Sequence, residues 1–436
     1  MGPAQATVRA TWVELIIVPV AIGAVTGVCV GVLVDVIERF FLERVVLGIP
    51  GPWFALPALG VFLLTRLALI RVAGTTRPST SELFPVYYHH SSRPYPLRQV
   101  PGRLLSGATT VGLGGSQGLE SQSVMVGNAL GVACRRLTRG RLAYLGTPHG
   151  RRLVLVCGAA AGIATVFSSP ILGAAYGIEM PFRRNLDGRR LLAAMLAAAS
   201  SFATASLIKS ARNLMTYVPH EIGLYEMFGV IVVAVLCGFG ARLFAIIMGR
   251  VRNWKDGPRP WGRAALAGVV LAGLAASSWW VTGAAVTAGP GYVASDWALP
   301  ASGPPPALLL LLAALAFRWA SVLLCIAAGG GGGVFTSLAT NGLLIGTATA
   351  VIMGLPNPTL LALVGMGAFL GAGYRIPLAG AGLIIELCGE AMPTALGIAG
   401  VAIATVLMGS HSASDAQEDQ VELDVPSSAG PPTVAP

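Results

Sequence analysis

Long apolar stretches alternate with short polar turns along most of this chain. A helix needs about 20 apolar residues to cross the ~30 Å hydrocarbon core of a bilayer. Shorter apolar stretches separate six windows of roughly that length, which cover residues 12–35, 53–70, 228–248, 261–285, 307–328 and 334–353. The pattern therefore predicts an all-α, polytopic membrane protein of roughly ten or more helices, many too short or too broken to cross straight.

The composition agrees with a membrane protein surrounded by lipid. Hydrophobic residues make up 54% of the 436 residues, charged residues only 11%, and the mean hydropathy is +0.72, whereas soluble domains carry roughly a quarter charged residues. Arginines gather in short loops at residues 135–141 and 183–190. By the positive-inside tendency we expect some of these loops to face the cytoplasm. Nothing in the pattern indicates nucleic acid as a partner.

Composition also divides the chain into three parts. Residues 1–10 form a short polar leader, and residues 11–408 form the predicted membrane domain. Residues 409–436 are rich in Ser, Pro and Gly and contain five acidic residues but no Lys or Arg, so the net charge of +10 hides +15 on residues 1–408. We predict that residues 409–436 are a disordered acidic tail.

A glycine-rich run at residues 112–119 delivers one carboxylate, Glu120, to the start of an apolar helix. The first N–H groups of a helix have no intrahelical partner, and with the positive end of the helix dipole they bind anions. Acids inside a membrane are costly and are usually functional. This pattern favours an anion site at Glu120, and an ordinary N-terminal helix cap is the alternative.

Two passages repeat one pattern: an aromatic residue, two further residues, Pro, and an acid nine residues after the Pro. They are residues 167–179 and 374–386, and their acids are Glu179 and Glu386. Repeated halves with broken helices are typical of transporter folds whose site lies at the repeat interface. We therefore predict a first half of about 11–210 and a second of about 222–408. The glycine run 329–333 supplies the second break, unless it is a flexible linker.

From about residue 12 to residue 408 the chain resembles the CLC family of chloride channels and chloride/proton antiporters. The passages GAAAGIATVFSSPILGAAYGIEM (158–180) and GMGAFLGAGYRIPLAGAGLIIEL (365–387) resemble two segments of that family, and their small residues let membrane helices approach closely. The resemblance implies two inverted-topology repeats and a homodimer in which each subunit has its own anion pathway. It also implies chloride held by helix N-termini and hydroxyls, with no cofactor and no metal.

Three short motifs carry the family's site residues onto this chain. GLESQS at 118–123 lies on the family's GREGPx motif, which makes Glu120 the gating glutamate that occupies an anion site until it is protonated or displaced. GGVFT at 332–336 lies on GxFxP, and GTTRP at 74–78 lies more loosely on GSGIP. The anion-binding residues implied in this way are Thr75, Gly118, Leu119, Ser121, Gly333, Val334, Phe335 and Thr336.

The chain also departs from these motifs. The family's Arg, Gly, Pro and Pro are replaced by Leu119, Ser121, Gln122 and Ser337. No tyrosine follows Tyr374, so the family's pore-facing tyrosine has no counterpart. We therefore expect an inner gate that is looser or built differently.

A further departure concerns protons. Met180 falls on the position that relays the inward proton in the family's antiporters, and a thioether carries no proton. Glu179, beside it, is interpreted as a structural hydrogen-bonding acid equivalent to Glu386. A proton route through Glu179 is the alternative.

These observations favour CLC-type chloride or anion transport by a passive channel or uniporter gated by Glu120, in a multi-pass protein of the cell membrane. A chloride/proton or fluoride/proton antiporter is the alternative, and a non-conducting relative is a more distant one. We expect no enzymatic activity, because the membrane acids lack catalytic partners and the histidines fall in loops or the tail; these are His89, His90, His149, His220 and His411.

Overall fold

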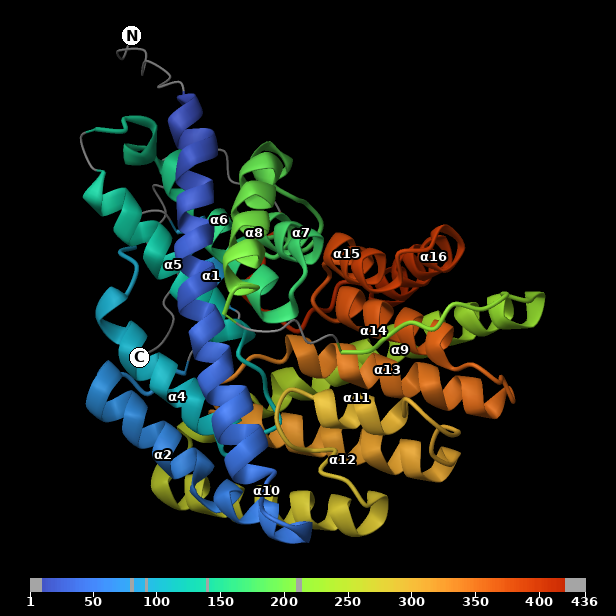
Figure 1. Ribbon diagram of the computed structural model, residues 1–436. Coiled ribbons are helices and arrows are strands. Elements are labelled where there is room, and N and C mark those ends of the chain that lie inside the picture. Colours follow the sequence, from blue (N-terminus) through green and yellow to red (C-terminus); the bar gives the residue numbers. More distant parts are fainter. Residues whose placement is uncertain (1–9, 79–81, 91–92, 139–140, 209–213, 420–436) are drawn as a thin grey trace.

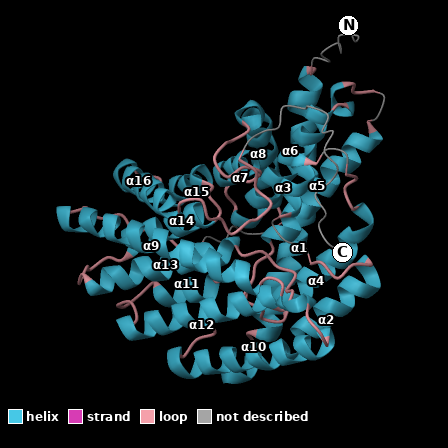
Figure 2. Cartoon of the chain, turned by 180° about the vertical axis from the view of Figure 1, so that it is seen from behind, coloured by secondary structure: helices cyan, strands magenta, loops and turns pink. Residues whose placement is uncertain are grey.

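The computed structural model describes residues 10–78, 82–90, 93–138, 141–208 and 214–419, which form α-helices and no strand (Figures 1 and 2). The first eight helices are α1 (Val18–Val34), α2 (Val61–Ala68), α3 (Leu83–His89), α4 (Val100–Gly112), α5 (Glu120–Leu137), α6 (Pro148–Phe167), α7 (Pro170–Glu179) and α8 (Leu191–Ala205). The second eight are α9 (Leu224–Val251), α10 (Pro260–Thr282), α11 (Tyr292–Ala298), α12 (Leu308–Ala327), α13 (Phe335–Ile352), α14 (Thr359–Gly373), α15 (Pro377–Cys388) and α16 (Ala391–Met408). The predicted all-α architecture is confirmed.

Eight helical segments among the described residues are long and apolar enough to span a membrane. They are Val13–Val46, Gly51–Ala73, Pro148–Phe167, Leu224–Asp256, Pro260–Thr282, Leu308–Ala327, Phe335–Ile352 and Ala391–Met408. All six predicted windows fall on such segments, so the multi-pass prediction is confirmed. Two of the eight spans, α6 and Ala391–Met408, lie outside the six predicted windows; the mean hydropathy of α6 is 1.5, and 94% of its apolar window is buried within the protein.

The two halves of the chain share one plan of helix packing. In the first half α1 packs on α8, α5 on α6, and α6 on α7. In the second half α9 packs on α16, α13 on α14, and α14 on α15. Figure 1 shows the first half in blue to green and the second half in yellow-green to red. The fold is therefore two inverted-topology repeats with broken helices, as predicted.

Glycines at one crossing in each repeat explain why the helices lie so close. A Cβ atom at Gly127 of α5 would lie 2.0 Å from the carbonyl oxygen of Gly158 in α6. A Cβ atom at Gly342 of α13 would lie 1.9 Å from the carbonyl oxygen of Gly365 in α14. Only residues without a side chain permit this backbone contact. The two crossings fix the directions of α5 and α13, the helices that begin at the predicted site.

The two termini differ from the prediction in one respect. Residues 1–9 of the predicted leader and residues 420–436 of the tail lie outside the described residues. Residues 409–419, however, are not a disordered tail: they fold back from the end of α16 against both halves, and Ser414 and Gln417 are buried. The composition of this segment shows that it has little apolar surface to bury. It carries no information on the backbone groups and charged side chains elsewhere in the protein that bind the segment.

Candidate anion site

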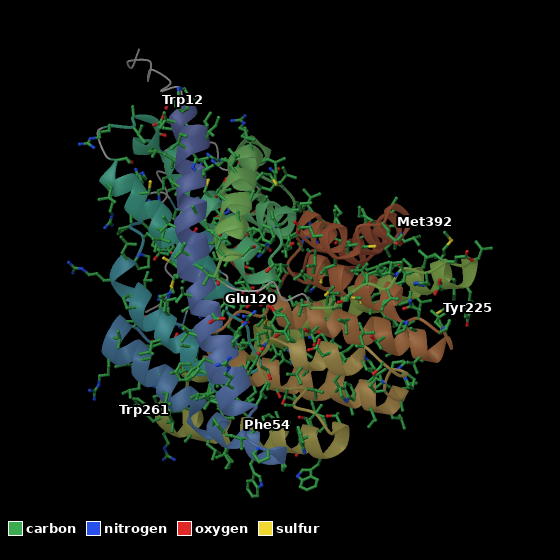
Figure 3. All side chains as sticks on the ribbon, in the orientation of Figure 1. Trp12, Phe54, Glu120, Tyr225, Trp261 and Met392 are labelled. Atoms are coloured by element: carbon green, nitrogen blue, oxygen red, sulfur yellow. The ribbon has the colours of Figure 1, made fainter. Side chains whose placement is uncertain are left out.

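Glu120 is the first residue of α5, and its carboxylate contacts the start of α13 in the other half. Oε1 accepts a hydrogen bond from the backbone N–H of Thr336, 2.5 Å away, and another from the Thr336 hydroxyl. The side chain is buried, and Figure 3 labels it near the middle of the molecule, where the halves meet. The carboxylate therefore occupies the N-terminus of α13, a place where helix geometry favours an anion.

Two reciprocal backbone hydrogen bonds between Gly118 and Gly333, which we call the bridge, lie next to this carboxylate. The N–H of Gly118 donates to the carbonyl of Gly333 (3.0 Å), and the N–H of Gly333 donates to the carbonyl of Gly118 (2.8 Å). A Cβ atom at either glycine would lie 2.4 Å or 2.6 Å from Oε2 of Glu120. A side chain at either position would therefore collide with the carboxylate of Glu120, so both positions require glycine.

The bridge corrects part of the predicted donor set. Gly118 and Gly333 were predicted to bind an anion, but the N–H group of each donates to the carbonyl oxygen of the other. Hydrogen bonding within α5 begins at Ser123 N–H to Leu119 O (2.9 Å), and within α13 at Leu338 N–H to Val334 O (2.9 Å). The N–H groups that precede Ser123 in α5 and Leu338 in α13 have no partner within their own helix. They lie at the two helix starts that meet at Glu120.

The glycine run 329–333 is held in place by side chains of the first half. The N–H of Gly331 donates to Thr110 Oγ1 (2.9 Å), and the N–H of Gly332 donates to Gln117 Oε1 (3.1 Å). Gln122 Nε2 donates to the carbonyl of Gly331. The run is thus part of the site and not a flexible linker.

An aromatic cluster closes one side of the site. The ring of Phe335 lies 5.0 Å from the ring of Phe167, 5.7 Å from that of Tyr176 and 6.2 Å from that of Tyr374, measured between centroids. Tyr374 was not predicted as a site residue, although it occupies the same place in its repeat as Phe167. The equivalence of Tyr374 and Phe167 in the sequence repeat could have predicted that Tyr374 lies at the site.

A cavity of about 520 Å³ leads to the site. Its inner end is lined by Gln117, Gly333 and Val334, and Tyr374 forms part of its wall. Five cationic side chains line it, against the two acids Glu82 and Asp256; the cations are Arg77, Arg93, Arg103, Arg252 and Lys255. Clustered charge of one sign in a cleft raises the local concentration of the opposite ion, so this cavity attracts anions.

Arg103 is the one buried residue among these cations, with 5% of its surface exposed. One nitrogen donates to Gln99, and Nε and Nη1 have no hydrogen-bond partner among the described residues. Burying a cation whose nitrogens are only partly hydrogen-bonded is costly, and an anion in the cavity would offset that cost. Thr75 does not itself line the cavity, but its hydroxyl accepts a hydrogen bond from the backbone N–H of Arg77, which does.

Glu179 and Glu386 each cap a helix of the other half. Glu179 accepts hydrogen bonds from the N–H groups of Leu378 (3.0 Å) and Ala379 (2.8 Å) at the start of α15. Glu386 accepts from the N–H groups of Ile171 (2.7 Å) and Leu172 (3.3 Å) at the start of α7. The two caps are equivalent in the repeat and join the halves through α7 and α15.

Replacing Glu386 with glutamine should destabilise the protein. A neutral amide keeps at most weaker bonds to the two N–H groups, and losing charge-assisted bonds of this kind costs roughly 1–3 kcal/mol. The thermal unfolding midpoint of the detergent-purified protein should fall. The matched control is Glu221→Gln, because Glu221 is exposed; equal midpoints for the two variants would show that the cap at α7 contributes no stability.

Comparisons with known proteins agree with this geometry. The chain matches the model of the family described as voltage gated chloride channel over residues 84–409. A chloride/fluoride channel protein of Pseudomonas syringae pv. tomato is 34% identical over 92 residues, which span 21% of this chain and only 19% of that relative.

Solved structures share the fold at low sequence identity. A slow cyanobacterial Cl⁻/H⁺ antiporter superposes with a TM-score of 0.76 at 21% identity, covering 91% of this chain and 94% of that one. A CLC-type fluoride/proton antiporter superposes with a TM-score of 0.78 at 20% identity, covering 94% of this chain and all of that one. Since the family model covers most of the chain, this protein belongs to the voltage gated chloride channel (CLC) family.

Proposed function

We propose that this protein carries chloride or other small anions passively across a membrane, as a channel or uniporter gated by Glu120. One observation carries the proposal: the Glu120 carboxylate occupies the N-terminus of α13 through its bonds to Thr336. Gly333, which lies against that carboxylate, also lines the inner end of the cationic cavity. An anion arriving from the cavity competes with the carboxylate for the same donors, so protonation or displacement of Glu120 opens the path.

The anion would be held by backbone and hydroxyl donors at the two helix starts. We assign this role to Leu119 and Ser121 on the α5 side and to Val334, Phe335 and Thr336 on the α13 side, while Gly118 and Gly333 form the bridge that positions them. The anion is the only ligand that this arrangement needs, and no cofactor is required. As the family resemblance implies, we further propose a homodimer with one pathway in each subunit.

The residues at and beside the position where the family's antiporters relay the inward proton favour passive transport over exchange. Met180 stands at the relay position and is buried, and its thioether cannot take up a proton. Both oxygens of the neighbouring Glu179 accept backbone hydrogen bonds from α15, which supports a capping role. The solved relatives are described as proton-coupled antiporters for chloride and for fluoride, so exchange is the competing function.

Parallel flux measurements test the proposal. The purified chain in liposomes should release chloride down its gradient without moving protons. Stoichiometric proton uptake driven by a chloride gradient would refute the passive mechanism, and Glu179→Gln would then show whether Glu179 carries those protons. A strong preference for fluoride would indicate the fluoride/proton alternative, and a protein that passes no anion would be a non-conducting relative.

A further inference from the structure

The segment after the last helix, residues 409–419, docks beside the anion cavity, and we call it the tail strap. Gly409 has a positive φ of 68°, which turns the chain back from the end of α16. The N–H of Ala413 donates to the carbonyl of Gly373 (2.8 Å) in the second half. Glu418 exchanges backbone bonds with the first half, donating to Pro181 (3.1 Å) and accepting from Arg183 (3.0 Å).

Buried polar contacts fix the strap between these backbone bonds. The side chain of Gln417 is buried, and its Nε2 donates to the carbonyl of Tyr374 (2.8 Å) while its Oε1 accepts from Ser412 (2.5 Å). Tyr374 is the residue whose ring stacks on Phe335 beside Glu120. The strap therefore supports the aromatic cluster at the inner end of the cavity.

Acidic residues of the strap meet cationic groups at the cavity. Arg252, which lines the cavity, bonds to Glu82 (2.5 Å) and Asp415 through Nη1, and it donates to the carbonyl of Ala413 (2.9 Å) through Nη2. Ala413 itself lines the cavity. Burial raises the pKa of Glu82 above its ordinary value, and the charge of Asp415 raises it further, while Arg252 opposes both. Two carboxylates thus share one guanidinium.

Two weaker contacts of the strap lie farther along. Oε2 of Glu418 lies 3.3 Å from Nδ1 of His89, and the other ring nitrogen of His89 faces the carbonyl of Pro181. Asp419 lies 4.0 Å from Arg184, and both of these side chains are more than half exposed. The strap thus docks beside the arginine-rich loop at residues 183–190. By the positive-inside tendency, we expect this side of the protein to face the cytoplasm.

We propose that the tail strap is a built-in brake at the cytoplasmic mouth of the anion pathway, with Asp415 competing against entering anions for Arg252. Asp415 adds a second negative charge at a guanidinium that Glu82 already neutralises. It therefore weakens the positive field that draws anions into the cavity. Because exposed ion pairs are weak and are screened by salt, the brake is strongest at low ionic strength. This regulation rests on the proposed transport function.

Neutralising Asp415 tests the electrostatic part of the brake. In proteoliposomes at about 10 mM salt, Asp415→Asn should raise chloride flux roughly two- to fivefold, and the difference should largely vanish at about 300 mM salt. The matched control is Asp419→Asn, which removes the same charge from the same segment at a solvent-exposed pair. Its flux should stay at the wild-type level.

Hydrogen exchange tests the docking itself. The backbone amides of Ala413 and Glu418 should be protected in the reconstituted wild type, and Gln417→Ala should reduce that protection while raising flux. Rapid exchange of both amides in the wild type would overturn the proposal. The proposal would also be overturned if the wild type transports chloride and neither Asp415→Asn nor Gln417→Ala changes the flux. A wild type that passes no anion would instead contradict the proposed function.

Discussion

Replacing Glu120 with glutamine should make chloride flux nearly independent of pH between about pH 4.5 and 7.5, while wild-type flux rises on acidification. The amide carries no negative charge, so it competes poorly with chloride for the N–H and hydroxyl of Thr336. A hydrogen bond to a charged group contributes about 1.5–3 kcal/mol, so near neutral pH the variant should conduct roughly tenfold faster or more. Chloride release from proteoliposomes at several pH values measures both effects.

The control for this variant is Glu386→Gln. It makes the same chemical change at a carboxylate that also accepts N–H bonds at a helix start, but at the junction of α7 and α15. Its flux per folded protein should keep the pH dependence of the wild type. If Glu120→Gln instead keeps the wild-type pH profile, the carboxylate is a cap for the helix starts and does not gate.

The position of Glu120 could be predicted because it depends on local sequence. A glycine-rich run followed by one acid and an apolar helix places a carboxylate at a helix start whatever the rest of the fold does. The repeat was equally accessible, since residues 167–179 and 374–386 carry the same pattern. These two features predicted the repeats and the place of Glu120 at a helix start, whereas its gating role is implied by the family resemblance and stays a prediction.

The partners of that helix start could not be predicted from local patterns. Gly118 pairs with Gly333, and Gln117 with Gly332, across more than 200 positions of sequence, and no periodicity encodes such pairings. The consequence was an error in the donor set, because the N–H groups of Gly118 and Gly333 are not available to an anion. The departure at Gln122 had a structural meaning as well: its amide holds the carbonyl of Gly331.

The tail shows a different limit. Its composition predicts disorder because it has little apolar surface to bury, and the same prediction holds for any segment of that composition. Ser414 and Gln417 are nevertheless buried, since docking depends on the carbonyls of Gly373 and Tyr374 and on the charge of Arg252. Complementarity with a remote surface decides the outcome, and only the folded structure displays that surface.

Substituting leucine for Gly342 should prevent the protein from reaching a stable fold. Its Cβ atom would lie 1.9 Å from the carbonyl oxygen and 2.5 Å from the carbonyl carbon of Gly365. Both are backbone atoms of α14, so no side chain can move aside, and α13 and α14 must separate. Overpacking of a well-packed interior costs typically about 1–3 kcal/mol and occasionally more. We expect little monodisperse protein, a much lower unfolding midpoint, and no flux.

Loss of flux follows from the same displacement, because α13 carries Thr336 and Phe335 at its start and the bonds to Glu120 depend on where that start lies. Gly273→Leu is the control: Gly273 lies within α10, is exposed, and has open space where a Cβ atom would extend, with no neighbouring atom within 4 Å. Gly127→Leu should match the Gly342 variant, since its crossing with Gly158 is the equivalent contact of the first repeat. A Gly342 variant as stable as the Gly273 variant would mean that α13 and α14 can shift without losing the fold, and the carboxylate of Glu120 would then lack a fixed binding place.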